Sequence, residues 1–163
     1  MLERVDVESR LTRDDHLSVR VWLRLLSCTN LIESRVAGRL RDDFDTTLPR
    51  FDFLSQLERH PGGLRMTDIS KRMMVTGGNV THIADQLLAE GLITRAVAPD
   101  DRRASIVKLS AAGRRAFAEM ARRHEEWIVA TFAGLNEAER SQLYALLAKL
   151  KRHLTAAESD HAR

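Results

Sequence analysis

Four charged residues stand together in the segment VAPDDRRASIVKL, between two short runs in which apolar and polar residues alternate. They are Asp100, Asp101, Arg102 and Arg103. Alternation around a polar turn predicts a two-stranded antiparallel ribbon that carries these charges at its tip. An arginine at a ribbon tip can enter the narrow minor groove of A·T-rich DNA. We expect Arg103 to take this role, Arg102 to contact phosphate, and Asp101 to hold the Arg103 guanidinium by a charge-assisted hydrogen bond.

The residues before the ribbon predict a helix over 77–89 whose outward face could read bases. Thr76 is a suitable N-cap for it. Near the start of the helix, Asn79 could bind adenine and His82 could donate to guanine or phosphate. Gly77 and Gly78 either let the backbone approach DNA or form a turn that starts the helix late. The expected buried face is Val80, Ile83, Ala84, Leu87 and Leu88. The candidate DNA contacts are Thr76, Gly77, Gly78, Asn79, Thr81, His82 and Gln86, with Asp101, Arg102 and Arg103 of the ribbon.

These segments belong to a pattern of helix, turn, helix and ribbon. A short helix is expected from about 66 to 74, before the helix over 77–89. The strands are expected over 92–98 and 105–109, joined by a turn over 99–103. One helix could then enter a major groove while the ribbon reaches the neighbouring minor groove. The sequence therefore predicts a winged helix-turn-helix, mainly α with a two- to three-stranded β wing.

Long amphipathic helices are expected on both sides of this small domain. One runs from about 15 to 44, a second follows an N-cap at Ser110, and a third starts at Asn136. Glu139 stands three residues after Asn136, as in a capping box. The polar tail after Ala156 is expected to fray.

The apolar stripes of these long helices exceed what the compact centre could cover. Pairing with a second copy would bury them, and a two-fold dimer would present two reading helices to a palindromic site. A monomer whose terminal helices fold back on each other is the alternative. We divide the chain into an N-terminal arm and dimerisation helix (1–48), a winged helix-turn-helix DNA-binding domain (49–113), and C-terminal dimerisation helices with a tail (114–163).

The composition excludes several classes of protein. The 163 residues carry a net charge of +3, and they include one cysteine and six histidines. No apolar run approaches the length of a membrane span, and no signal-peptide core is expected at the N-terminus. The single cysteine favours a reducing cytoplasm. The histidines are dispersed, and no phosphate loop, HExxH motif or nucleophile elbow is present. We therefore expect neither an enzyme nor a bound metal or cofactor.

Three motifs lie in one stretch from Leu64 to Phe117: the D-x-R of Asp101 and Arg103, the sequence EGLI after the reading helix, and L-S-x-x-G after the ribbon. With them, the chain from about 17 to 154 resembles the multiple-antibiotic-resistance regulator (MarR) family of winged-helix transcription factors. The resemblance implies a homodimer assembled through terminal helices. It also implies a repressor that small, often aromatic, ligands release from DNA, with recognition helix 77–89. Gly77–Gly78 departs from the serine, proline or threonine of many members.

The segments MMVTGGNVT and TLPRFDFLSQLER are similar to family members that sense hydroxycinnamoyl-CoA thioesters in aromatic-compound catabolism. That similarity implies an aromatic pocket between the first two helices and the winged domain. Arginines such as Arg24, Arg35, Arg39 or Arg50 would then meet CoA phosphates. For Trp22 and Phe51 the alternative is ordinary core packing, which aromatic residues at helical spacing favour. The candidate ligand residues are Trp22, Leu26, Arg39, Phe51 and Leu54.

Two other functions remain open. Cys28 on the first helix could make the protein a thiol-based redox-sensing repressor. It lies on the apolar stripe, which favours an inert core thiol, and the only tyrosine is the distant Tyr144. A winged helix used only to bind protein is the second alternative. Steep salt dependence of DNA binding would separate it from a DNA-binding regulator.

Overall fold

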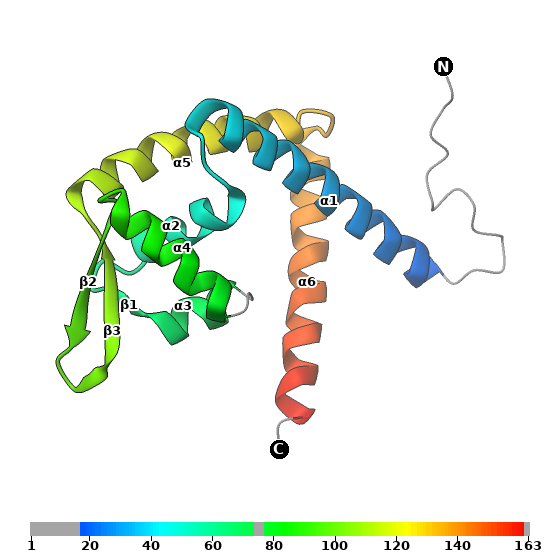
Figure 1. Ribbon diagram of the computed structural model, residues 1–163. Coiled ribbons are helices and arrows are strands. Elements are labelled where there is room, and N and C mark those ends of the chain that lie inside the picture. The colour runs from blue at the N-terminus through cyan, green and yellow to red at the C-terminus, as the bar shows by residue number, and fades with distance from the viewer. Residues whose placement is uncertain (1–16, 74–76, 162–163) are drawn as a thin grey trace. The chain divides into compact units, whose positions relative to one another are not determined.

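The computed structural model describes residues 17–73 and 77–161, and this part of the chain is mainly helical (Figure 1). Residue contacts divide the chain into a first unit, Met1–His124, and a second unit, Glu125–Arg163. The predicted domain boundaries stay predictions. The elements are α1 (Leu17–Phe44), α2 (Leu48–Glu58), β1 (Leu64–Arg65), α3 (Met66–Met73), α4 (Gly77–Ala89), β2 (Ile93–Ala98), β3 (Asp101–Leu109), α5 (Ala111–Thr131) and α6 (Glu137–His161).

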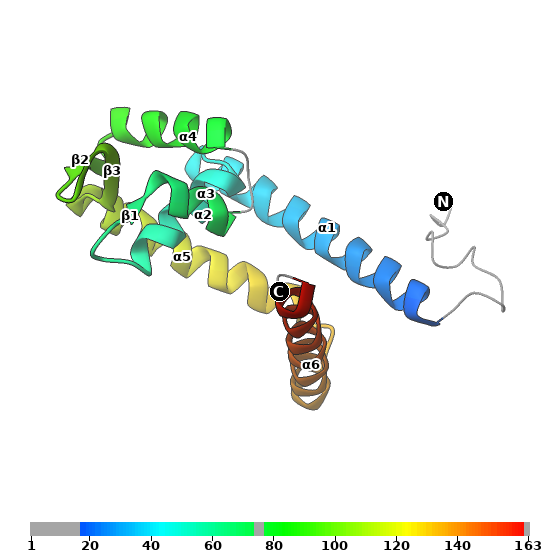
Figure 2. The same cartoon turned by 90° about the horizontal axis from the view of Figure 1, so that it is seen from below.

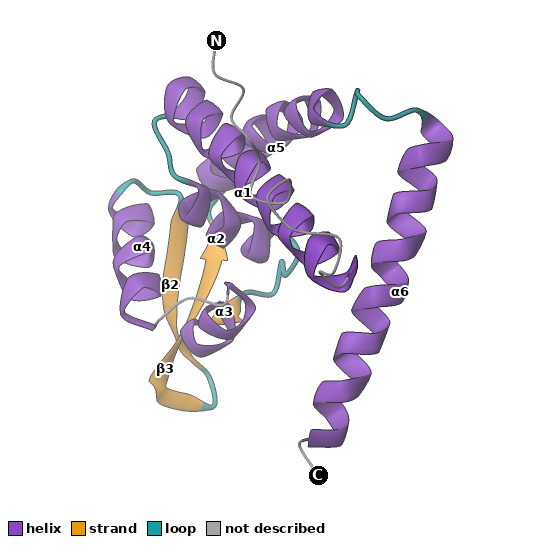
Figure 3. Cartoon of the chain, turned by 90° about the vertical axis from the view of Figure 1, so that its right-hand side faces the viewer, coloured by secondary structure: helices purple, strands orange, loops and turns teal. Residues whose placement is uncertain are grey.

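The strands form one antiparallel sheet in the order β1-β3-β2. Ile93 pairs with Leu109 and Ala98 with Asp101, so the strands continue almost to the turn. The predicted five-residue turn is therefore wrong: only Pro99 and Asp100 connect the strands, and the next three residues belong to β3. Figure 3 shows the β2–β3 ribbon extending beyond α3 and α4. The expectation of a mainly α fold with a small β wing is confirmed.

The core of the first unit lies where α2, α3 and α4 pack against the sheet. Figure 2 shows α4 as an outer layer over α2 and α3. Leu88 is 41% exposed, so its predicted burial is wrong. It follows the fully buried Leu87 directly, and successive helical side chains point about 100° apart. The largest side chains that are almost fully buried are Phe53, Leu40, Leu54, Leu57, Ile69, Leu87, Val80 and Val107.

The connection between α1 and α2 is fixed by hydrogen bonds at both helix ends. Asp45 has a left-handed backbone with φ 48°, a conformation that Asp tolerates better than most residues. Its N–H donates to the Arg41 carbonyl at 3.1 Å, and the Thr46 N–H donates to the Leu40 carbonyl at 3.3 Å. The Asp45–Arg41 bond is the 5→1 bond of the αL C-cap motif, and it closes the end of α1. The Thr47 hydroxyl then caps α2 by accepting from the Arg50 N–H at 3.4 Å.

The predicted caps of the last two helices are confirmed. Ser110 Oγ accepts from the Gly113 N–H at 2.9 Å at the start of α5. Before α6, the Asn136 side chain accepts from the Glu139 N–H at 3.0 Å, and the Glu139 carboxylate accepts from the Asn136 N–H at 2.8 Å. The helix α6 continues beyond Ala156 to His161, and the expectation that this tail frays stays a prediction. Over 17–73 and 77–161, no helix combines the length and apolar character needed to span a membrane.

Candidate nucleic-acid interface

One face of α4 is buried and the other presents polar side chains. Val80, Ile83 and Leu87 pack into the core. On the outward side, Gln86 Nε2 lies 3.1 Å from His82 Nε2, one helical turn away. The predicted exposure of Asn79, Thr81, His82 and Gln86 is confirmed. The helix begins at Gly77 as predicted, while the expected N-cap, Thr76, lies outside the described residues.

The tip of the ribbon is tied to β1 by an arginine that sequence reasoning missed. Arg65 Nη2 donates to both carboxylate oxygens of Asp100, at 2.7 and 2.6 Å. Arg65 Nη1 also lies 4.0 Å from Asp101 Oδ2. These residues are 35 positions apart, and no local pattern links them. The ion pairs fix where the ribbon tip lies relative to the rest of the sheet.

Asp101 does not hold the Arg103 side chain, so that prediction is wrong. Its Oδ1 atom accepts a hydrogen bond from the Arg103 backbone N–H at 2.9 Å. This bond shapes the backbone at the start of β3. Within the described part of the chain, neither Arg102 nor Arg103 forms an ion pair, and both are exposed. Their guanidinium groups can therefore meet phosphate or a minor groove without first breaking a salt bridge.

Two further ion pairs hold α4 in place. Asp85 on its outer face lies 3.7 Å from Arg95 of β2. At its end, Glu90 accepts a hydrogen bond from Arg50 of α2, 40 positions earlier in the chain. The turn after α4 is closed by the left-handed Gly91. The reading helix is thus linked through side chains both to the sheet and to α2.

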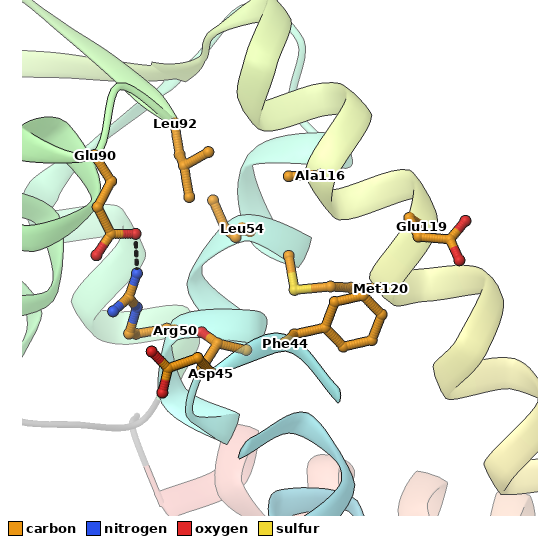
Figure 4. A pocket seen from close by; sticks show the side chains of 10 residues that line it. Phe44, Asp45, Arg50, Leu54, Glu90, Leu92, Ala116, Glu119 and Met120 are labelled. Carbon is orange, nitrogen blue, oxygen red and sulfur yellow. Dashed lines mark hydrogen bonds and ion pairs between the residues drawn. The ribbon is translucent and has the colours of Figure 1, made fainter. Parts of the chain in front are cut away.

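The five residues predicted to bind a ligand do not line one common cavity in the structure. Leu54 is buried and lines a cavity of about 440 Å³ (Figure 4). Phe51 is core, as the packing alternative predicted, with its ring 5.4 Å from that of Phe117. On α1, Trp22 is 59% exposed, so the core expectation for it is wrong. Trp22, Leu26, Arg39 and Phe51 are not among the residues that line this cavity. Periodicity identified the apolar face of α1, but none of the residues that the structure describes in the first unit covers the part around Trp22.

Titratable groups near α5 respond to their surroundings. His124 packs against Phe51 with ring centroids 4.9 Å apart, and burial lowers the pKa of His124 below its ordinary value. Hydrogen bonding from Arg122 at 2.7 Å lowers the pKa of Glu119, so this carboxylate stays ionised near neutral pH. Among the residues that the structure describes, no group of three or more His, Cys, Asp or Glu side chains could hold a metal ion.

Cys28 is exposed, so the prediction of a core thiol is wrong. It lies on α1, on the apolar stripe that sequence periodicity identified. The error has the same cause as the one for Trp22: periodicity identified the apolar stripe, but the described residues leave this part of it exposed. Because the side chain is exposed, an oxidant could reach the Cys28 thiol.

A short reading helix, a tied ribbon and exposed arginines define a winged-helix DNA-binding protein. A family model for the MarR family matches residues 44–104, from the last residue of α1 through the whole of α2 to the first part of β3. An HTH-type transcriptional regulator from Bacillus cereus, itself uncharacterised, is 28% identical over 143 residues, covering 86% of this chain and 93% of the relative. The chain has a winged-helix fold and is similar to transcriptional regulators of the MarR family. The relatives found are transcriptional regulators and not enzymes.

Solved structures agree with this assignment. BpsR from Bordetella bronchiseptica is 27% identical, with a TM-score of 0.66 over 78% of this chain and 98% of that one. That structure concerns the regulation of DNA binding by 6-hydroxynicotinic acid. AbsC, a MarR family regulator from Streptomyces coelicolor, is 20% identical and shares the fold, with a TM-score of 0.73 over 89% of this chain and 99% of that one.

Proposed function

We propose that the protein is a homodimeric repressor that binds a palindromic operator and is released by a small aromatic ligand. The observation that carries the proposal is the joint placement of α4 and the ribbon. Each has exposed DNA-compatible groups, and each is tied to the same core by ion pairs, Arg50 to Glu90 and Arg65 to Asp100. A rigid pair of elements can enter adjacent grooves without a large ordering cost on binding.

Within this interface, the residues near the start of α4 read bases in the major groove. Asn79 contacts adenine, and His82 and Gln86 reach base edges or phosphate. Thr76 and Thr81 contact phosphate, and Gly77 and Gly78 let the helix start approach the duplex backbone. On the ribbon, Arg103 enters the minor groove and Arg102 contacts phosphate, while Asp101 shapes the backbone that carries them.

Dimerisation is supported by apolar side chains that each unit leaves exposed. Leu17, Trp22 and Leu31 of α1 are exposed in the first unit. In the second unit, Tyr144 and Leu146 of α6 are exposed in the same way. Rows of exposed large apolar residues on long helices are typical of protein interfaces. A second copy would cover them and would place two reading helices on two half-sites.

An aromatic effector is supported by the similarity to BpsR, whose DNA binding is regulated by an aromatic acid, and by the cavity that residues of α2, α5 and the turn after the reading helix line. An aromatic acyl-CoA thioester is the finer form of the proposal, and its acyl group would be the part that enters the protein. Such a ligand would connect the regulator to aromatic-compound catabolism.

The test measures the oligomeric state of the protein and the salt dependence of its affinity for DNA. Operator sequences are selected from random duplex DNA with the full chain, and the molar mass of the free protein and the complex is measured by light scattering. We expect a dimer on a palindrome, with affinity falling about 10³- to 10⁵-fold between 50 and 200 mM salt if 6–10 phosphates are contacted. A monomer in both states, or an affinity that salt leaves unchanged, would contradict the proposal.

Exposure of Cys28 favours one second candidate, a repressor released by thiol oxidation. Peroxide would then weaken operator binding by the wild type and leave Cys28→Ser unaffected. Equal behaviour of the two proteins would exclude this candidate.

A further inference from the structure

Two polar side chains on the outward face of α4 are joined to each other. Gln86 Nε2 lies 3.1 Å from His82 Nε2, and both residues are exposed. Residues four positions apart are neighbours on a helix surface, so α4 alone brings this pair together. Because α4 forms an outer layer over α2 and α3 (Figure 2), the pair lies on a surface that DNA can approach.

The two nitrogen atoms of this contact can share a hydrogen bond in only one way. An amide nitrogen carries two hydrogens and does not accept, so Gln86 must donate. His82 Nε2 must then accept, which places the proton of the neutral imidazole on Nδ1. The contact therefore fixes the tautomer of His82 and also the side of the Gln86 amide that faces the ring.

The acidic residues nearest to Gln86 in the chain are engaged with arginines. Asp85 lies 3.7 Å from Arg95 of β2, and Glu90, one turn after Gln86, accepts a hydrogen bond from Arg50 of α2. A carboxylate binds a guanidinium more strongly than it binds a neutral amide. Within the described part of the chain, His82 is therefore the acceptor that holds the Gln86 amide.

The orientation of this amide determines which base Gln86 can read. Its Oε1 atom and its second N–H are left for DNA, as one acceptor and one donor. Adenine presents the matching pair in the major groove, the N6 donor and the N7 acceptor, whereas guanine presents two acceptors, O6 and N7. On guanine, Oε1 would face O6 unless the amide turned over. Turning over would place Oε1 against the accepting Nε2 of His82, and both acceptors would lose a hydrogen bond.

We propose that His82 is a positioning residue that holds the Gln86 amide, so that Gln86 reads adenine in preference to guanine. The inference rests on the proposed function, which places α4 in a major groove. It adds that two residues together, rather than Gln86 alone, determine the preference at this base pair. The Nδ1–H of His82 can still donate to a phosphate, and such a contact strengthens binding to every sequence alike.

The first measurement needs no DNA. Proton–nitrogen NMR correlation spectra of the full chain, in mildly alkaline buffer, report which imidazole nitrogen carries the proton, and the His82 signal is assigned by its loss in His82→Ala. We expect the proton of His82 on Nδ1 in the wild type, and a shift of population towards Nε2–H in Gln86→Ala. A wild-type His82 that is protonated at Nε2, or the same tautomer population in both proteins, would overturn the proposal.

The second measurement is a ratio of two affinities. Operator duplexes carry either A·T or G·C at the position where Gln86→Ala loses its base preference, and the ratio is free of contacts that all sequences share. One good bidentate contact discriminates between bases by about 5- to 150-fold, so the wild type should favour adenine by that factor. In His82→Ala the preference should fall below about threefold. An unchanged ratio in His82→Ala, or no position at which Gln86→Ala loses a preference, would overturn the proposal.

A rescue variant separates positioning from direct contact. His82→Glu supplies an acceptor and no donor, so it should retain most of the adenine preference while its negative charge weakens binding to both duplexes. Adding Gln86→Ala to His82→Glu should abolish that preference, because Gln86 is the residue that reads the base. If the preference persists in this double variant, the side chain at position 82 reads adenine itself and the proposal is wrong.

His153→Ala is the matched control, because His153 is an exposed histidine on α6. It should keep the wild-type ratio and the wild-type tautomer of His82. Since His82 and Gln86 are exposed, thermal unfolding should show changes of no more than about 4 °C in the variants. If the wild type binds no duplex, the proposed function is overturned and the reading of adenine with it. Normal operator binding with a ratio that does not depend on His82 would overturn only this inference.

Discussion

Substituting Arg65 should weaken DNA binding far more than it weakens the fold. The side chains of Arg65 and Asp100 are 36% and 70% exposed, and ion pairs this exposed contribute up to about 1 kcal/mol to stability. Arg65→Ala should therefore lower the melting temperature by no more than about 4 °C. The same change removes both hydrogen bonds that Arg65 donates to the Asp100 carboxylate. Because only Pro99 and Asp100 form the turn, the backbone at the ribbon tip should become more mobile.

The expected loss of affinity follows from the cost of ordering the tip again on DNA. Fixing one residue's backbone costs about 1–2 kcal/mol, so each wing should lose about five- to thirty-fold in binding. Fluorescence anisotropy with an operator duplex at several salt concentrations measures this loss. Arg65→Lys keeps the cation beside Asp100 and should recover most of the affinity, whereas Arg65→Gln should not.

The salt slope separates positioning from direct contact. If Arg65 acts only through Asp100, the dependence of log affinity on log salt should be the same in Arg65→Ala and in the wild type. A slope smaller by about 0.9 for each lost contact would mean that Arg65 binds phosphate itself. Additive effects of Arg65→Ala and Asp100→Ala in a double-mutant cycle would also refute the reasoning, because two residues that act through one ion pair cannot be independent.

Four further outcomes are expected. Arg103→Ala should weaken operator binding and relax the preference for A·T pairs beside each half-site, as read from selected sequences. Asn79→Ala should cost about 1–3 kcal/mol at one base position, whereas an equal loss on every sequence would make Asn79 a phosphate contact. Gly113→Ala should destabilise the fold in thermal unfolding, because a Cβ there would lie 1.8 Å from the Leu92 carbonyl oxygen. Burial lowers the pKa of His124 in the folded protein below its ordinary value of 6.5, so the unfolded protein binds a proton at His124 more readily than the folded one. The free energy of unfolding should therefore fall as the pH drops below about 6.5, and His124→Phe should weaken this pH dependence.

Local signals in the sequence were sufficient to place the helices. Ser110 and the Asn136–Glu139 pair were identified from side-chain type and spacing alone, and both cap a helix as expected. These interactions join residues three positions apart, so the sequence itself brings the partners together. The polar face of α4 followed in the same way from helical periodicity.

Local patterns in the sequence could not predict the contacts between residues that are far apart in the chain. Arg65 with Asp100 and Arg50 with Glu90 are 35 and 40 positions apart, and only the folded chain brings them together. Periodicity also shows which residues share a face without showing what covers that face. For this reason Cys28, assigned to the core from the stripe of α1, is exposed in the single chain.

The turn that ends the reading helix and the first turn of α5 are joined as one piece. Ser110 Oγ donates to the Gly91 carbonyl at 2.6 Å, and the Ser110 N–H donates to the Leu92 carbonyl at 3.0 Å. Gly113 lies so close to Leu92 that only a residue without a side chain fits. No hinge is therefore available between them. Any signal that displaces the end of α4 must carry the start of α5 with it, or first break these two hydrogen bonds.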